Sequence, residues 1–125
     1  MIILDTDVLI EILNKRGRRG EDAMKILRSN HDDIATTAIN IHEVQYGLEK
    51  RGETNPDIHR LRALPYTKSD ARLSAKLELL AEKDGTPIHR MDAMIASIAI
   101  NHGARLFTYN TSHFRALQPH GLELL

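Results

Sequence analysis

The N-terminus of this chain joins an apolar run directly to an acid. Residues 1–4 are Met, Ile, Ile and Leu, Asp5 follows at once, and apolar residues resume at Val8. A short apolar run of this kind is typical of a buried strand in a parallel sheet. Asp7 suits the N-cap of a helix over residues 8–13, because its carboxylate can accept from free amides one turn on. We therefore expect a strand that delivers the Asp5 carboxylate to one edge of a sheet.

Along the rest of the chain, short apolar runs alternate with helical patterns. Residues that suit caps bound the helices: Thr37 before one, Ser69 or Asp70 before another, and Gly103 after a third. This βαβα alternation implies a parallel sheet with helices on both faces. Predicted strands cover residues 1–4, 33–36, 64–66, 105–109 and 122–125; predicted helices cover 8–13, 21–29, 38–50, a short stretch beginning at 58, and then 70–83, 91–102 and 112–116.

Composition favours one globular domain over residues 1–125, since 42% hydrophobic and 27% charged residues suit a folded chain. Seventeen basic residues balance seventeen acidic ones, so any anionic partner must be held by a local patch. Without cysteine the chain has no disulfide and no thiolate metal site. No targeting segment is visible, and the longest apolar segment is far shorter than the roughly 18 residues that span a bilayer. We expect a cytoplasmic protein without membrane attachment.

Four polar side chains are predicted to meet at the carboxyl edge of the sheet. Asp5 and Asn110 each follow a strand, Asp92 opens an apolar helix, and Glu43 lies off the apolar row of its own helix. Ligands of open parallel sheets bind at this edge. Three carboxylates placed together repel one another unless a cation compensates. Oxygen donors suit Mg²⁺ or Mn²⁺, and the chain has no H-x-x-x-H or H-E-x-x-H spacing for zinc.

Each acid also has a purely structural interpretation. Asp5 is equally explained as a turn residue that leads into the first helix. Asp92 could simply complement the positive end of its helix. Glu43 could face solvent. These interpretations give the acids no common location, whereas the metal hypothesis requires all three at one edge.

A basic stretch follows the first helix and is predicted to be an exposed loop. Its cations could hold the phosphates of a nucleic acid, although a short charge run is more often only a solvated surface. We interpret His42 and His113 as structural residues, because no serine or cysteine nucleophile accompanies them. Phosphate-binding glycine loops are also absent from the sequence. The cations of the stretch are Lys15, Arg16, Arg18 and Arg19.

Four blocks of sequence lie at these predicted strand ends and helix starts. They are ILDTDVLI at residues 3–10, TAINIHEVQYG at 37–47, DAMIA at 92–96 and LFTYNTSHF at 106–114. Taken together, they resemble the PIN domain, in particular VapC-type toxin ribonucleases. The resemblance covers essentially the whole chain.

The resemblance implies a three-layer α/β/α sandwich with a mainly parallel sheet, and a ribonuclease that depends on Mg²⁺ or Mn²⁺. Asp5, Glu43 and Asp92 match the family's three core acids, which ligate metal and act in catalysis. Supporting positions around these acids match Thr6, Thr108, Asn110 and His113. Many members carry an acid at one of the last two positions, so the asparagine removes a charge and makes a second metal uncertain.

The activity implied by the resemblance is hydrolysis of RNA phosphodiesters. Asp5 and Asp92 would ligate the metal directly, and Glu43 would orient or deprotonate a metal-bound water. The resemblance also implies a homodimer and inhibition by a small VapB-like antitoxin.

Two alternatives remain. One is a catalytically weak or inactive PIN domain that binds RNA or serves in assembly. The other is a flavodoxin-like receiver domain, which would need a lysine after a late strand, where this chain has Tyr109 and Asn110.

Overall fold

The computed structural model describes residues 1–14 and 17–125. Within these residues, five strands pair in parallel in the order β3-β2-β1-β4-β5. In the middle of the sheet, Ile3 pairs with Ala35 on one side and Leu106 on the other. All the strands therefore end at the same edge. Their bounds are β1 (Ile2–Leu4), β2 (Ile34–Thr37), β3 (Ala63–Leu64), β4 (Arg105–Phe107) and β5 (Glu123–Leu124).

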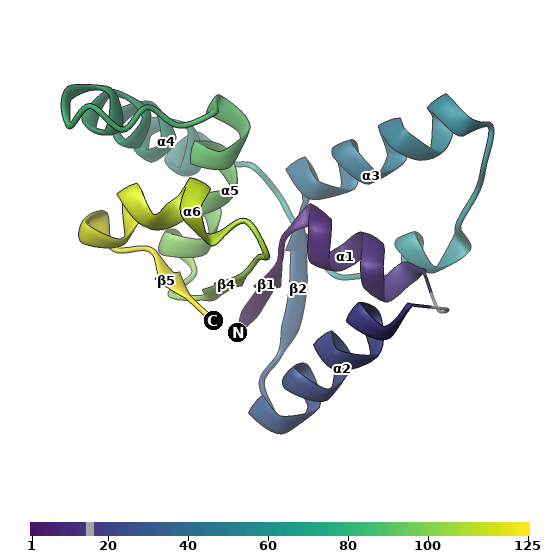
Figure 1. The fold of residues 1–125 in the computed structure, drawn as a ribbon. Helices are drawn as coiled ribbons and strands as arrows, with labels where there is room; N and C mark the ends of the chain where they lie inside the picture. Colours follow the sequence, from purple (N-terminus) through teal and green to yellow (C-terminus); the bar gives the residue numbers. More distant parts are fainter. Residues whose placement is uncertain (15–16) are drawn as a thin grey trace.

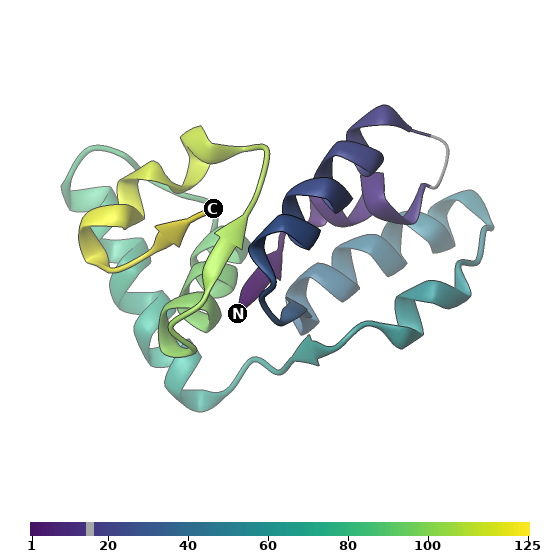
Figure 2. The same cartoon turned by 90° about the horizontal axis from the view of Figure 1, so that it is seen from below.

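Helices cover both faces of this sheet, in two groups (Figure 1). One group packs α1, α2 and α3 together, and the other packs α5 against α4 and α6. Figure 2 shows the same two groups from below. The predicted three-layer α/β/α sandwich is thus confirmed. The helices are α1 (Thr6–Leu13), α2 (Arg18–Asn30), α3 (Ala38–Arg51), α4 (Lys68–Lys83), α5 (Arg90–Asn101) and α6 (Thr111–Phe114), with 3-10 turns η1 (Pro56–Arg60) and η2 (Arg115–His120).

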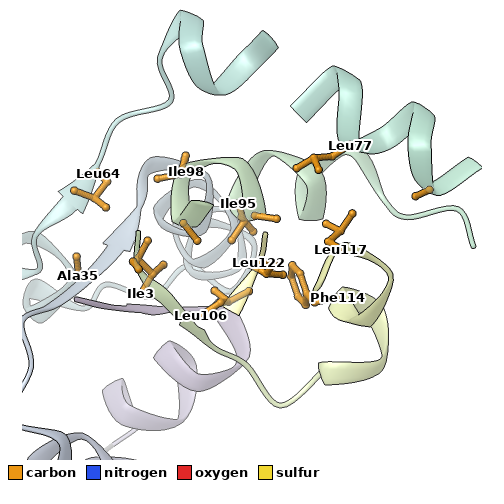
Figure 3. Close-up of a cluster of buried hydrophobic side chains, with 14 residues drawn as sticks. Ile3, Ala35, Leu64, Leu77, Ile95, Ile98, Leu106, Phe114, Leu117 and Leu122 are labelled. Carbon is orange, nitrogen blue, oxygen red and sulfur yellow. The ribbon is translucent and has the colours of Figure 1, made fainter. Parts of the chain in front are cut away.

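The strands separate two hydrophobic cores because successive side chains point to opposite faces. Ile2 and Leu4 join the core under α1, α2 and α3, whereas Ile3 joins the core under α4 and α5. Figure 3 shows the second core, where Ile95 and Ile98 of α5 lie between the sheet and the residues that follow β4. Both faces of β1 are fully buried, which explains its uninterrupted apolar run.

The start of the first helix differs from the prediction. The helix begins at Thr6, and Asp5, not Asp7, is its N-cap, with extended backbone and a carboxylate that accepts from the Thr6 amide. Asp7 lies in the first turn. There its carboxylate accepts from the amides of Val8 at 2.7 Å and Tyr109 at 3.0 Å, which ties α1 to the segment after β4.

Several other boundaries shift by a few residues. Thr37 caps α3 as predicted, but α4 is capped by Thr67 rather than by Ser69 or Asp70, through a capping box in which Asp70 is the third helical residue. The predicted loop at residues 15–20 is wrong from Arg18 onward, because α2 begins there. Lys15 and Arg16 lie outside the described residues.

The early start of α2 depends on close packing against α1. A Cβ atom at Gly20 would lie 2.3 Å from the backbone oxygen of Glu11, so only glycine allows the two helices to approach this closely. None of the helices formed by the described residues is both long enough and apolar enough to span a membrane.

Candidate active site

Asp5 stands where β1 ends and α1 begins, and its carboxylate is held from three directions. Oδ1 accepts from the Thr6 amide at 2.8 Å and from Asn40 Nδ2 at 3.0 Å. Oδ2 accepts from Thr108 Oγ1 at 2.7 Å. The residue is only 6% exposed. Its partners come from α1, α3 and the segment after β4, so the fold fixes this carboxylate in one orientation.

Glu43 is linked to Asp5 through the hydroxyl of Thr6 and the side-chain amide of Asn40. Thr6 Oγ1 donates to Glu43 Oε1 at 2.7 Å and accepts from Asn40 Nδ2 at 3.0 Å. Glu43 is half-buried on the face of α3 that turns toward α1. The interpretation of Glu43 as a solvent-facing residue therefore does not hold.

Asn40 is the functional-site residue that the sequence prediction missed. It is completely buried, and its amide nitrogen donates both to Asp5 and to the hydroxyl of Thr6. Its amide oxygen accepts from Thr37 Oγ1 at 2.6 Å. One signal was available in the sequence, since an asparagine one turn before Glu43 shares its side of the helix. Asn40 therefore fixes the orientation of both carboxylates, one directly and one through Thr6.

Asp92 enters the site from the first turn of α5. Its Oδ2 lies 3.9 Å from His113 Nδ1, which α6 supplies, and the ring of His89 lies 6.2 Å from that of His113. Asp92 is half-buried. The two histidines thus line the side of Asp92 that faces α6.

The pKa values of Asp5 and Asp92 are both raised, and neighbouring carboxylates contribute to each shift. Burial raises the pKa of Asp5 above its usual 3.8, and the nearby Glu43 raises it further, although the bonds from Thr108 and Thr6 oppose the shift. Burial likewise raises the pKa of Asp92, with additional repulsion from Asp5 and Glu43 and partial compensation by His113. The three acids therefore act on one another through space, as the metal hypothesis requires.

Asp7 adds a fourth carboxylate beside this group. Burial raises its pKa, and the charge on Asp5 raises it further. The sequence prediction treated Asp7 only as a cap. The D-x-D spacing of residues 5 and 7 was the available signal for a second acid at this edge.

The donor set suits a hard divalent cation that keeps part of its water shell. Within residues 1–14 and 17–125, no three acidic or histidine side chains converge as a ready-made metal cage. Mg²⁺ is usually bound through one or two carboxylates, with water and substrate phosphate completing its octahedron. Mutually repelling carboxylates beside an open edge fit that mode of binding.

Asn110 contacts Thr108 through its backbone amide and not through its side chain. The Asn110 amide donates to Thr108 Oγ1 at 3.0 Å, and that hydroxyl in turn donates to Asp5. Asn110 is exposed, and its side chain makes no hydrogen bond to the acids among the described residues. Thr108 therefore supports Asp5 directly, and Asn110 supports it only through this hydroxyl.

The described part of the basic stretch lies beside the same edge. The Arg19 guanidinium stacks over the Tyr109 ring at 4.1 Å from its centroid, and its Nη1 lies 3.8 Å from Glu11 Oε1. Arg18 is exposed at the start of α2. Asp7, Glu11, Arg19 and Tyr109 line an open hollow of about 270 Å³ there. Two acids in its wall leave this hollow without a net positive charge.

The fold and these acids define a class, that of PIN-type α/β domains with carboxylates at the carboxyl edge of the sheet. Residues 2–118 match the family profile described as "PIN domain". The chain belongs to the PIN domain family.

Individual relatives extend this match. Ribonuclease VapC2 of Rickettsia felis is 28% identical over 122 residues, covering 92% of this chain and 90% of the relative. VapC ribonuclease Y4jK of Sinorhizobium fredii is 30% identical over 143 residues, covering 100% and 96%. The crystal structure of Rickettsia felis VapBC2 bound to a DNA fragment from its promoter contains a similar chain, with a TM-score of 0.81 and 26% identity, covering 100% and 98%. The predicted resemblance to VapC-type members is thus confirmed.

Proposed function

We propose that this PIN-domain protein is a VapC-type endoribonuclease, the toxin of a toxin–antitoxin pair, which hydrolyses RNA phosphodiesters with Mg²⁺ or Mn²⁺. The observation that carries the proposal is the network in which Asn40 and Thr6 hold the carboxylates of Asp5 and Glu43 beside Asp92. Relatives named VapC ribonuclease that match nearly the whole chain support the same reaction.

Asp5 and Asp92 are the residues that would hold the cation. When bound, a divalent cation polarises a phosphate oxygen and makes water a better nucleophile. Asp5 keeps an unused acceptor position on Oδ2, because Thr108 is the only described residue that donates to that atom. The three hydrogen bonds on Asp5 keep its geometry constant while a ligand arrives.

Glu43 would take the proton of the attacking water. Thr6 occupies Oε1, and among the described residues no donor engages Oε2, so this oxygen can accept a proton. Attack of the water oxygen on phosphorus forms the new P–O bond, and the P–O bond to the 3′ carbon's oxygen breaks. The leaving oxygen takes up a proton, and the products carry a 5′-phosphate and a 3′-hydroxyl.

The same proposal includes the protein's partners. Similar chains occur in Rickettsia felis VapBC2 and in a toxin–antitoxin complex from Klebsiella pneumoniae, so we propose a VapB-like antitoxin as the cognate partner. We further propose that residues 1–125 act as one cytoplasmic catalytic domain that forms a homodimer. The exposed Asn110, which replaces an acid, leaves one rival: a PIN domain that binds RNA without cutting it.

Cleavage of RNA separates the proposal from this rival. The wild-type chain, purified from its antitoxin, is incubated with a structured RNA in Mn²⁺, Mg²⁺ or EDTA, and the 5′ ends of the products are mapped. We expect metal-dependent cleavage that the Asp5→Asn variant loses. Asp22→Asn is the matched control, because Asp22 is exposed on α2 and makes no hydrogen bond to Asp5, Glu43 or Asp92 among the described residues. Wild-type cleavage by Asp5→Asn would show that the nuclease activity comes from a contaminant or from another site.

A further inference from the structure

A second hollow lies beside Asp92 and is distinct from the hollow that Arg19 lines. It has a volume of about 390 Å³ and lies between residues 86–88, which precede α5, and residues 112–116, which follow β4. His113 is one of the residues that line it, and His113 Nδ1 lies 3.9 Å from Asp92 Oδ2. A molecule that fills this hollow would therefore be in reach of the carboxylate edge.

The charge of the lining distinguishes this hollow from the one beside Arg19. The wall contains Arg115 and His113, and none of its lining residues is acidic. Arg115 is exposed and has no ion-pair partner among the described residues, whereas Arg90 nearby is paired with Glu78 at 3.2 Å. An uncompensated guanidinium in a groove without carboxylates attracts an anion.

The groove also has an apolar wall. Pro87, Ile88 and Ala116 line it, and Ile88 is held in place by packing against the core under α4 and α5. An apolar wall beside a cation suits a nucleotide, because the base can pack against the apolar side chains while the phosphate binds the cation. Ser112 and Thr86 add hydroxyls that can bond a sugar or a base edge.

We propose that this groove binds the nucleotide next to the scissile phosphate of single-stranded RNA, with Arg115 holding its phosphate. The inference rests on the proposed function, since it describes the path of the substrate beside the acids. The proposal assigns the RNA strand to the α6 side of the carboxyl edge of the sheet. The hollow lined by Asp7 and Glu11 would repel a phosphate and is left outside the path.

Binding measurements test the groove without relying on cleavage. In an Asp5→Asn background, a fluorescein-labelled single-stranded RNA 12-mer is titrated and its anisotropy is followed at several salt concentrations. Arg115→Ala should raise Kd about fivefold, the effect of one surface ion pair. It should also lower the slope of log K against log salt by about 0.7, the value for one phosphate contact.

Arg62→Ala is the matched control. Arg62 is exposed, has no ion-pair partner among the described residues, and precedes β3 at the opposite end of the sheet. It should leave Kd and the salt slope unchanged. The proposal is overturned if Arg115→Ala binds like its parent, or if Arg62→Ala loses as much affinity.

Amide chemical shifts locate the strand independently. On addition of the 12-mer, the amides of Ile88, Ser112 and Ala116 should shift. Shifts confined to Glu11 and Arg19 would overturn the proposal. Failure of the proposed function is seen separately, as an absence of Asp5-dependent cleavage by the wild type, and the binding results then still decide whether the groove takes RNA.

Discussion

Replacing the buried acid of the site should stabilise the metal-free protein while removing its activity. Asp5→Asn keeps the shape of the side chain but removes a charge that burial and Glu43 both disfavour. The hydrogen bonds can survive, because the Thr108 hydroxyl that now donates to Asp5 can turn and accept from the new amide. The bonds from Asn40 and Thr6 to the remaining oxygen are unchanged.

The expected gain in stability of Asp5→Asn follows from opposing effects on the Asp5 carboxylate. Loss of the charge weakens three hydrogen bonds, but burial is the largest cause acting on its pKa and the net shift is upward. Replacing an unfavourable active-site charge of this kind typically raises the free energy of unfolding by about 1 kcal/mol. For a chain of 125 residues, the average unfolding entropy converts this into a rise of about 4 °C in Tm.

The sign of the pH dependence follows from the same shift. Because the folded-state pKa of Asp5 lies above 3.8, the folded protein binds this proton more tightly than the unfolded chain does. Protonation of Asp5 therefore stabilises the folded protein fully below pH 3.8. This stabilisation is lost as the pH rises through the raised folded-state pKa. Asp92 and Asp7 act in the same direction. The advantage of Asp5→Asn should therefore be small at pH 4 and full at pH 7.

Scanning calorimetry in EDTA at pH 4 and pH 7 measures both effects, with Asp22→Asn as the control for loss of an exposed charge. Added Mn²⁺ should raise the Tm of the wild type and not that of Asp5→Asn, because a ligand stabilises only the state that binds it. If Asp5→Asn melts below the wild type in EDTA at pH 7, the carboxylate stabilises the fold and the reasoning from burial and repulsion is refuted.

Four further substitutions test the network and its scaffold. Asn40→Ala should lower kcat and weaken Mn²⁺ binding by about 10-fold or more, as does loss of a residue that hydrogen-bonds to a metal ligand. Electron paramagnetic resonance of free Mn²⁺ measures the affinity, and unchanged binding would contradict the assigned role. Thr108→Val should act similarly, because Asp5 loses one of its three donors; an unaltered rate in the cleavage assay would show that this hydroxyl is dispensable. Gly20→Ala should destabilise by roughly 1–3 kcal/mol in urea unfolding, since its methyl group would lie 2.3 Å from a backbone oxygen of α1. Gly47→Ala, with only an arginine side-chain nitrogen 3.5 Å away, should instead stabilise α3 by about 0.5–1 kcal/mol, and equal effects at both glycines would refute the packing argument.

The network around Asn40 shows how the fold uses neutral groups to hold repelling acids. An amide can donate to two oxygens at once without adding a charge of its own. Thr6 and Thr37 complete the chain of bonds between α1 and α3. Buried side-chain nitrogen and oxygen atoms without a hydrogen-bond partner are absent from the described residues. The carboxylates are therefore held in fixed positions before any ligand binds.

Local patterns in the sequence were enough to predict the architecture. Residues 2–4 are apolar without alternation because both faces of β1 are covered, and the alternation of strands with helices admits a parallel sheet. The cap at Thr37 was also predictable, since its hydroxyl serves an amide only three residues away. The three acids were assigned to one edge because parallel strands share a carboxyl end.

Helix boundaries were less accurate where long-range contacts decide them. Asp5 rather than Asp7 caps α1, because Asp7 is engaged by the amide of Tyr109, more than a hundred residues away. The early start of α2 depends on its contact with α1 at Gly20. Neither contact leaves a periodic pattern in the sequence.

By itself, then, the sequence determined the layers of the fold, because periodicity and local caps act over a few residues, and it predicted which acids form the site. Only the tertiary structure decided how those acids are held. Asn40 and Thr108 lie far from Asp5 in the sequence, and their bonds to Asp5 exist only once β1, α3 and the segment after β4 are packed together. The raised pKa of Asp5 likewise arises from burial, which is a property of the assembled fold.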